Sequence, residues 1–424
     1  MTALPEFLDE KKALACIHCG LCLGSCPTYL QTGNENESPR GRIYIMRALQ
    51  DGRLPVDHAS VQHIDLCLGC RACEVACPSG VQYGGLLEQT RDFIEKKYSR
   101  SPMQTFLRRI VIERLFPVPW RMKLALAPAR LAKSLGLDRV LPRVLREPLQ
   151  LIPERIDSTP IPELSPAREQ PAKGTVGFVR GCVMSVMFGD TNASSVRLLN
   201  AAGFNVVVPR EQECCGALFA HSGRLSLARD YARRNIAAFA KHKLDAIVIN
   251  AAGCGSTLKE YGHLLEREPD AAKFGGMVKD LTEFLTQNGF AARSFVQSPD
   301  RVTYHDACHL AHPQRITRQP RELVKAVAGA NYVELPEADV CCGSAGTYNL
   351  TEPKMARELQ ERKVQNILRT HAKVVVTSNP GCILQIRAGL EKHDVRVMHI
   401  ADFVAQALEF EARQVPSSNF ATTS

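Results

Sequence analysis

The stretch CIHCGLCLGSCP, residues 16–27, places four cysteines within eleven positions and ends the run with a proline. A second stretch, CLGCRACEVACP at residues 67–78, repeats the same spacing. Both read C-x2-C-x2-C-x3-C-P, which is the bacterial ferredoxin pattern for a [4Fe–4S] cluster. Structural zinc, the alternative for closely spaced cysteines, usually binds two separated C-x2-C pairs. The two runs therefore predict two iron–sulfur clusters.

The spacing also predicts which cysteines bind together. Three cysteines separated by two residues can reach three corners of one cubane, but the fourth lies too far along the chain. In two-cluster ferredoxins this fourth cysteine binds the other cluster. The expected ligands are Cys16, Cys19, Cys22 and Cys77 for the first cluster, and Cys67, Cys70, Cys73 and Cys26 for the second.

Length and composition indicate a multidomain protein with redox chemistry. A chain of 424 residues is too long for one ordinary core, and 45% hydrophobic with 23% charged residues is typical of a globular protein. The opening MTALPEFLDEKK lacks the pattern of a signal peptide, and no apolar run is long enough to span a membrane. We therefore expect a cytoplasmic location, where sixteen cysteines favour metal binding over disulfides.

The other eight cysteines lie in a duplicated segment. TVGFVRGCVMS corresponds to RVTYHDACHLA, and the offset between matched cysteines drifts only from 126 to 128 residues. In each copy, short β-branched runs precede cysteine loops and helical patterns, which predicts a parallel α/β sheet with the loops gathered at one edge. The two sets are Cys182, Cys214, Cys215 and Cys254, and then Cys308, Cys341, Cys342 and Cys382.

These repeats resemble the cysteine-rich CCG domain of heterodisulfide-reductase-like proteins. In its fullest form that domain has five cysteines and ends in CxxC, whereas Ala251 and Asn379 stand at the first of those positions here. Three interpretations remain open for each set: a further iron–sulfur cluster, a zinc site, or a docking scaffold with residual thiols. Near Cys308, the stretch HDACHLAH offers His305, His309 and His312 as nitrogen ligands, a proton relay, or a polar interface loop.

Two further segments carry charge. Residues 38–44, SPRGRIY, begin a helical stretch that we expect to pack between the cluster loops, with Arg40 and Arg42 offsetting the clusters' negative charge. Residues 96–149 contain thirteen Lys or Arg against three Asp or Glu. Their amphipathic pattern fits either an interdomain helix or a helix on an anionic membrane surface. No nucleic-acid-binding module accompanies this charge, so no nucleic-acid partner is expected.

Over almost its full length the chain resembles the iron–sulfur subunits of glycolate oxidases, properly glycolate dehydrogenases. The motifs that carry this resemblance are CIHCGLC, SPRGRIY, CPSGVQY and CCGSAGTYNL. The resemblance implies an electron-transferring subunit with no catalytic residue of its own. FAD-containing partner subunits would oxidise glycolate, and a membrane quinone or similar acceptor would receive the electrons. The chain itself has no G-x-G-x-x-G fingerprint for a flavin.

The alternatives are the equivalent subunit of a lactate or glycerol-3-phosphate dehydrogenase, a thiol–disulfide enzyme, and a zinc-binding scaffold. A peripheral position on the inner face of the cell membrane is compatible with the quinone acceptor. The expected fold is a mainly α-helical two-[4Fe–4S] ferredoxin domain followed by two duplicated α/β CCG domains. The expected divisions are a ferredoxin domain at 1–95, a basic helical segment and Pro-rich linker at 96–172, CCG domains at 173–298 and 299–410, and a flexible tail at 411–424.

Overall fold

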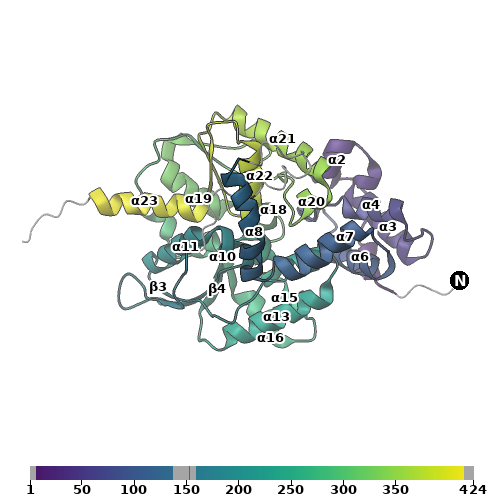
Figure 1. The fold of residues 1–424 in the computed structure, drawn as a ribbon, viewed down its shortest axis with the longest axis horizontal. Helices are drawn as coiled ribbons and strands as arrows, with labels where there is room; N and C mark the ends of the chain where they lie inside the picture. Colours follow the sequence, from purple (N-terminus) through teal and green to yellow (C-terminus); the bar gives the residue numbers. More distant parts are fainter. Residues whose placement is uncertain (1–5, 137–151, 153–158, 415–424) are drawn as a thin grey trace, which may run out of the picture.

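The N-terminal unit consists of short helices around the cysteine runs, seen at the right of Figure 1. The computed structural model describes residues 6–136, 152 and 159–414. The elements of this unit are α1 (Glu10–Leu14), η1 (Leu23–Ser25), α2 (Pro27–Thr32), η2 (Glu35–Glu37), α3 (Pro39–Gln50), α4 (His58–Asp65), α5 (Ala72–Val75) and α6 (Tyr83–Lys97).

Helix α3 is the centre of this unit, as the SPRGRIY motif predicted. The Ser38 hydroxyl accepts a hydrogen bond from the Gly41 amide and caps the helix, and Pro39 occupies its first turn. A side chain at Gly41 would place Cβ only 2.0 Å from the Glu35 carbonyl oxygen, so this position requires glycine. The buried face of α3 packs against α4 and α6 and so lies between the two cysteine runs.

The two repeats form two sheets with the same strand order. The first sheet runs β1-β3-β2-β4-β5, and the second runs β7-β6-β8-β9. All pairs are parallel except β1 with β3. Without β1, the two orders match strand for strand, which confirms the predicted duplicated α/β folds.

The bounds of the repeat elements are as follows. The first repeat contains β1 (Leu164–Ser165), β2 (Gly174–Val179), α10 (Cys182–Met187), α11 (Gly189–Ala201), β3 (Phe204–Val207), α12 (Ala217–His221), α13 (Leu225–Ala240), β4 (Ala246–Ile249), α14 (Ala252–Lys259), α15 (Tyr261–Leu264), α16 (Pro269–Met277), β5 (Val278–Asp280), α17 (Leu281–Gln287) and η5 (Phe290–Ala292). The second contains β6 (Val302–Tyr304), α18 (Cys308–Ala311), α19 (Arg318–Ala328), η6 (Gly329–Asn331), β7 (Tyr332–Val333), α20 (Tyr348–Thr351), α21 (Pro353–Arg369), β8 (Val374–Thr377), α22 (Pro380–Gly389), β9 (Arg396–His399) and α23 (Ile400–Gln414).

The repeats share their hydrophobic core. Phe178 of β2 and Tyr304 of β6, equivalent positions in the two copies, belong to one buried cluster. Helices also pack across the boundary, α11 against α23 and α17 against α19. Each repeat therefore has its own sheet, but neither buries its apolar surface alone.

The basic segment packs between the N-terminal unit and the repeats. It forms α7 (Pro102–Phe106), the π-helical stretch η3 (Leu107–Leu115) and α8 (Pro119–Ser134). Arg100 and Arg108 bind acidic groups of the N-terminal unit, and Met122 is buried in the core of the repeats. These contacts fit the interdomain interpretation.

Three element boundaries differ from those expected. Helix α6 continues to Lys97, two residues beyond the predicted end of the first domain, because Ile94 and Phe93 still face the core. Strand β1 lies inside the predicted linker, where it adds an edge to the first sheet. Helix α23 continues to Gln414 and so includes the first residues of the predicted tail. Part of the predicted linker, residues 137–151 and 153–158, lies outside the described residues.

Within the described residues, no helix combines the length and apolar character needed to cross a bilayer.

The shared core predicts that one substitution destabilises both repeats together. Phe178→Ala should lower the free energy of unfolding by about 3–5 kcal/mol, because Phe178 is fully buried. Chemical denaturation followed by circular dichroism should show one transition at lower denaturant. Leu164→Ala at the exposed sheet edge is the control, with an expected change within about 0.5 kcal/mol. Two separate transitions for the repeats would contradict a shared core.

Candidate metal centres

Four cysteines from both N-terminal runs meet around one small cavity. Cys26 comes from the first run and precedes α2, whereas Cys67, Cys70 and Cys73 come from the second. All four are buried and line the cavity together with Arg42 of α3 and Tyr83 of α6. These four cysteines are the set that the sequence predicted for the second cluster, with Cys26 crossing over from the other run.

The spacing of these thiols fits a cluster better than a single ion. Four thiolates around one zinc ion lie about 3.8 Å apart, because each Zn–S bond is about 2.3 Å long. Among the described residues, three ligand atoms lie within 4.8 Å of one another only at His305, Cys342 and Cys382. No three of the four N-terminal thiols approach one another this closely, and their spacing around the cavity leaves room for a larger group such as a cubane.

Buried donors surround the sulfur atoms of this cavity. The Tyr83 hydroxyl donates to Cys67 Sγ over 3.5 Å, and the Gly69 amide reaches the same sulfur over 3.4 Å. The Thr28 hydroxyl lies 3.3 Å from Cys26 Sγ. Hydrogen bonds to ligand sulfur stabilise its negative charge and tune the potential of a bound cluster.

Arg42 places a buried positive charge beside these sulfurs. Its side chain is 1% exposed, and one guanidinium nitrogen lies 4.0 Å from Cys26 Sγ. Although burial opposes the charge, Cys67, Tyr83, Cys26 and Glu37 together raise the pKa of Arg42. Its second partner is Glu37, whose carboxylate accepts a hydrogen bond at 2.6 Å. The guanidinium is therefore permanently charged and fixed in place.

Without metal, burial favours the protonated thiols of Cys70 and Cys73. Burial raises the pKa of Cys70 and of Cys73 well above the usual range, and neighbouring cysteines add to the effect. A bound metal deprotonates such thiols directly, so the site binds tightly only when metal supplies the compensating charge.

The cysteines predicted for the first cluster lie nearer the surface. Cys19 is exposed, and the other three are partly buried: Cys16, Cys22 and Cys77. The Cys22 pKa is raised by burial, with smaller contributions from Cys16 and Cys26. Leu14, Ile17 and Leu21 in the same loop are exposed apolar side chains. The cysteines predicted for the first cluster are therefore more exposed to solvent than the four buried cysteines predicted for the second.

Each repeat brings its four cysteines together at the carboxyl ends of its strands, as the topology predicted. Cys182 and Cys308 begin α10 and α18, directly after β2 and β6. The paired cysteines precede Gly216 and Gly343, whose φ angles of 86° and 88° turn the chain into the next segment. A Cβ on Gly343 would lie 2.4 Å from the Ala356 carbonyl oxygen, which explains glycine after the cysteine pair.

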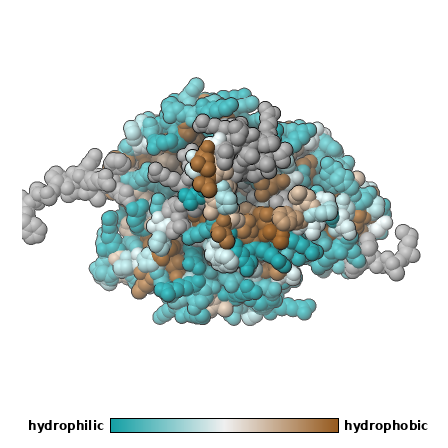
Figure 2. Space-filling model, viewed as in Figure 1, coloured by the Kyte–Doolittle hydropathy of each residue, from teal (hydrophilic) through white to brown (hydrophobic). Residues whose placement is uncertain are grey.

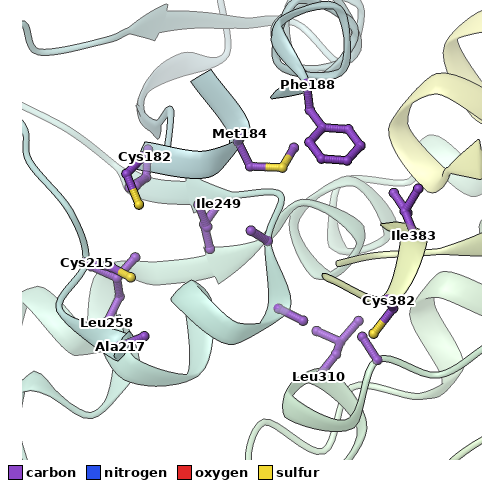
Figure 3. Packing of buried hydrophobic residues seen from close by; sticks show 14 of the residues in the cluster. Cys182, Met184, Phe188, Cys215, Ala217, Ile249, Leu258, Leu310, Cys382 and Ile383 are labelled. Atoms are coloured by element: carbon purple, nitrogen blue, oxygen red, sulfur yellow. The ribbon is translucent and has the colours of Figure 1, made fainter. Parts of the chain in front are cut away.

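Within each set the thiols form a row. In the first repeat, Cys182 Sγ lies 3.7 Å from Cys214 Sγ, and contacts continue through Cys215 to Cys254. The second repeat has the same row, which runs Cys308, Cys341, Cys342 and Cys382. Figure 3 shows Cys182 and Cys215 together, with Cys382 apart from them across the apolar core. The repeats therefore carry two separate sites.

The second repeat touches the buried N-terminal site. Cys70 shares an apolar cluster with Cys308 and Cys341, and the charge of Cys308 contributes to the raised Cys70 pKa. The His309 ring nitrogen lies 3.0 Å from the Gly69 carbonyl oxygen, and the Tyr348 hydroxyl donates to Leu66 O over 2.7 Å. These contacts surround the loop that carries Cys67 and Cys70.

The three histidines of HDACHLAH have different environments. His309 contacts the Cys70 loop of the N-terminal unit, whereas His312 Nε2 lies 3.1 Å from the Asp339 carbonyl oxygen within the second repeat. His305 is fully buried near Cys342 and Cys382. Sequence analysis missed Tyr83 and the buried Lys363. Tyr83 lies within the motif CPSGVQY, but its partner Cys67 is visible only in the fold.

Comparisons with known proteins agree with this geometry. Family profiles match residues 12–81 as "4Fe-4S dicluster domain", 176–259 and 302–387 as "Cysteine-rich domain", and 103–156 as "Glycolate oxidase iron-sulfur subunit, linker region". The chain is 40% identical to a "Probable glycolate oxidase iron-sulfur subunit" of Bacillus subtilis (strain 168), over 95% of each chain. It is 33% identical to the "Glycolate oxidase iron-sulfur subunit" of Escherichia coli (strain K12), over 94% of each.

The chain belongs to the family of glycolate oxidase iron–sulfur subunits. Its N-terminal unit is a [4Fe–4S] dicluster domain, which confirms the predicted cofactor class. A solved structure with the same fold is a hypothetical protein from Helicobacter pylori, with a TM-score of 0.56 at 9% identity. That match covers 94% of this chain and 74% of the other. The assignment of individual cysteines to each cluster stays a prediction.

The charge of Arg42 should raise the reduction potential of the cluster beside it. Arg42→Gln removes a buried positive charge, so the reduced and more negative cluster loses stabilisation and the potential should fall. EPR-monitored redox titration of the full chain measures this shift. Arg42→Lys keeps the charge and should shift the potential less, and the exposed Arg53→Gln is a surface control. An unchanged titration for Arg42→Gln would rule out this role.

Proposed function

We propose that the chain is the electron-transfer subunit of a flavin-dependent glycolate dehydrogenase complex. Glycolate would lose two electrons and two protons to a partner's FAD and leave as glyoxylate. Two [4Fe–4S] clusters on this chain, as one-electron carriers, would then connect reduced flavin with a quinone or similar acceptor. The membership of the family carries this proposal, and the sixteen cysteines, eleven of them buried, support it.

The cavity geometry supports the proposed division of the cysteine ligands between two clusters. Cys26, Cys67, Cys70 and Cys73 surround the buried cavity and would hold the inner cluster. The remaining cysteines of the two runs, Cys16, Cys19, Cys22 and Cys77, would hold the outer one. One cysteine from each run would thus serve the other run's cluster, which requires both loops to be in place for either site to form.

The surface around the outer site suits docking of the flavin subunit. Electron transfer between proteins requires a cofactor near the interface, and Cys19 is exposed there. Ile17 and Leu21 beside it are 69% and 63% exposed, which gives an apolar rim around the outer cysteines. In contrast, the inner cysteines are covered by α3, α6 and the second repeat.

A glycolate assay of the reconstituted complex tests this function. Glycolate should reduce the flavin of the partner and then the acceptor, and D-lactate and glycerol-3-phosphate serve as rival substrates. Cys22→Ser should almost abolish acceptor reduction while glycolate still bleaches the flavin, because the outer site loses a ligand. Ser25→Ala in the same loop is the matched control.

Two outcomes would contradict the proposal. Acceptor reduction that persists in Cys22→Ser would exclude the outer site from the electron path. Turnover with glycerol-3-phosphate or lactate alone would assign the chain to a different dehydrogenase of the same layout.

The basic segment supports a membrane-surface location for the acceptor step. Trp120 and Leu124 of α8 are 63% and 68% exposed, and Met103 of α7 is also exposed. Figure 2 shows hydrophobic surface over α7 to α8 on this face. Arg121 stacks on Trp120 at 5.3 Å, and Lys123 adds a further cation. Exposed tryptophan beside cations matches the interface of an anionic membrane.

Vesicle sedimentation tests this docking. The full chain should bind vesicles with anionic phospholipid and release them at high salt, while pure phosphatidylcholine vesicles bind weakly. The double variant Trp120→Ser with Leu124→Ser should lose most binding, and Leu164→Ser, equally exposed on the first sheet's edge, should not. Unchanged binding by the double variant would contradict the membrane role of α8. If the double variant lost only its partner subunits, α8 would be a protein interface.

A further inference from the structure

The two repeats differ at the ends of their central strands. His305 follows β6 at the position of Val179, which ends β2 in the first repeat, because matched residues here differ by 126. Thr377 ends β8 where Ile249 ends β4. The register pairs Val179 with Ile249, and continuing the β6–β8 register by one residue places His305 beside Thr377. Two apolar side chains in one repeat are thus replaced by two polar ones in the other.

These polar side chains have no partner within the described part of the protein. His305 and Thr377 are 0% exposed. Neither ring nitrogen of His305 has a hydrogen bond of normal geometry, and neither has the Thr377 hydroxyl, although the Ala338 backbone acts on the His305 pKa. Buried polar groups are almost always paired, so three such atoms at one place indicate a bound group between them. In the first repeat, Val179 and Ile249 need no such partner.

The His305 ring is directed toward cysteine ligands. One of its nitrogen atoms and the Cys342 and Cys382 sulfurs all lie within 4.8 Å of one another. Asn379, which stands where the fullest five-cysteine pattern has its extra cysteine, instead donates to Cys382 Sγ over 3.7 Å. The loop after β8 thus lacks the extra cysteine of the five-cysteine pattern. The His305 imidazole, which directly follows β6, instead lies close to the Cys342 and Cys382 sulfurs.

A second difference points to negative charge at this site. Lys363 of α21 is 2% exposed, and its ammonium donates to the carbonyl oxygens of Glu337 and Ala338. The corresponding residue of the first repeat is the neutral Asn235 of α13, which binds Cys214 O. A buried ammonium is costly unless an anion lies near it. Burial lowers the pKa of Lys363, whereas Cys342, Cys341, Asp339 and Glu337 favour its charged form, so thiolates there would add to the counter-charge.

We propose that His305 is a nitrogen ligand of an iron–sulfur cluster held by the four cysteines of the second repeat. Contacts link Cys308 to Cys341, Cys341 to Cys342 and Cys342 to Cys382, so with His305 the site offers five donors, one more than a tetrahedral zinc ion takes. Lys363 offsets its negative charge, and the first repeat lacks both groups. The cluster ligand Cys70 of the N-terminal unit lies against Cys308, so this site is next to the inner ferredoxin-type site. The inference goes beyond the proposed function and does not depend on which substrate the complex oxidises.

Isotope labelling of histidine tests the ligand directly. The full chain, purified anaerobically, is prepared with natural or 15N-labelled histidine and poised by redox titration. Pulsed EPR should show a nitrogen hyperfine coupling that changes with the label. His305→Cys should bind the same amount of iron but lose this coupling, because a thiolate replaces the imidazole. Because His305→Cys replaces a neutral imidazole with a negatively charged thiolate, it should also lower the reduction potential of this cluster.

Metal analysis adds a readout that is independent of spectroscopy. His305→Val, which introduces the residue of the first repeat, should lose the iron beyond the eight atoms or so of the two ferredoxin-type clusters. Their EPR signals should remain and so report that the variant is folded. His312→Gln, in the same loop with its nitrogen on a carbonyl oxygen, is the matched control and should keep all iron.

Three results would overturn the proposal. The first is a wild-type chain with no histidine coupling in any oxidation state. The second is a coupling that persists in His305→Cys, which would assign it to another histidine. The third is zinc in place of the additional iron. Each of these leaves the two N-terminal clusters, and therefore the proposed electron-transfer function, standing.

Discussion

The packing of the loop from Cys67 to Cys70 is the constraint on which the arrangement depends. This short segment supplies sulfur atoms to the buried N-terminal cavity and also forms the contact surface for the second repeat. Arg91 binds the Cys67 carbonyl oxygen over 2.6 Å and the His221 carbonyl oxygen over 2.9 Å, so it ties the loop to the first repeat as well. Because sulfur ligands must be held rigidly for fast electron transfer, a loop fixed from three sides is an effective support.

Charge compensation runs through the same region. Sulfur-rich sites concentrate negative charge where water is excluded, and two of the buried sites here have a buried cation near them. Arg42 serves the N-terminal cavity and Lys363 faces the second repeat. Arg71 lies at the border, paired with Glu74 and with Glu260 of the first repeat at 2.6 Å. Buried cations of this kind would be unfavourable in an ordinary apolar core, and their presence marks where anionic groups belong.

Duplication explains both the likeness and the difference of the two repeats. The strand order, the glycine after the paired cysteines and the row of thiols are common to both. Because the copies share one core, most of their apolar faces must stay complementary, and Phe178 and Tyr304 show this in one cluster. At the strand ends around the cysteines the copies differ, because Val179 lies in an apolar cluster whereas His305 is a buried polar residue near Cys342 and Cys382. The two copies are therefore chemically distinct at this position.

The sequence by itself predicted which residues bind metal in the N-terminal unit, and it determined that two α/β repeats follow. Cysteine spacing is a local property, because a few residues of chain fix how far apart ligands on one loop can lie. Strand and helix periods are local in the same way, and so the duplicated topology was predictable.

Only the tertiary structure decided what meets across loops. The Tyr83 hydroxyl meets Cys67, Cys70 meets Cys308, and His305 lies near Cys342 and Cys382. The sequence showed His305 as one of three histidines in a polar stretch, with nothing to single it out. Its distinction arises because residues far apart in the chain converge at the ends of parallel strands, and burial there leaves its ring without a protein hydrogen-bond partner. Contacts of this kind depend on the packing of the whole chain, which local pattern does not encode.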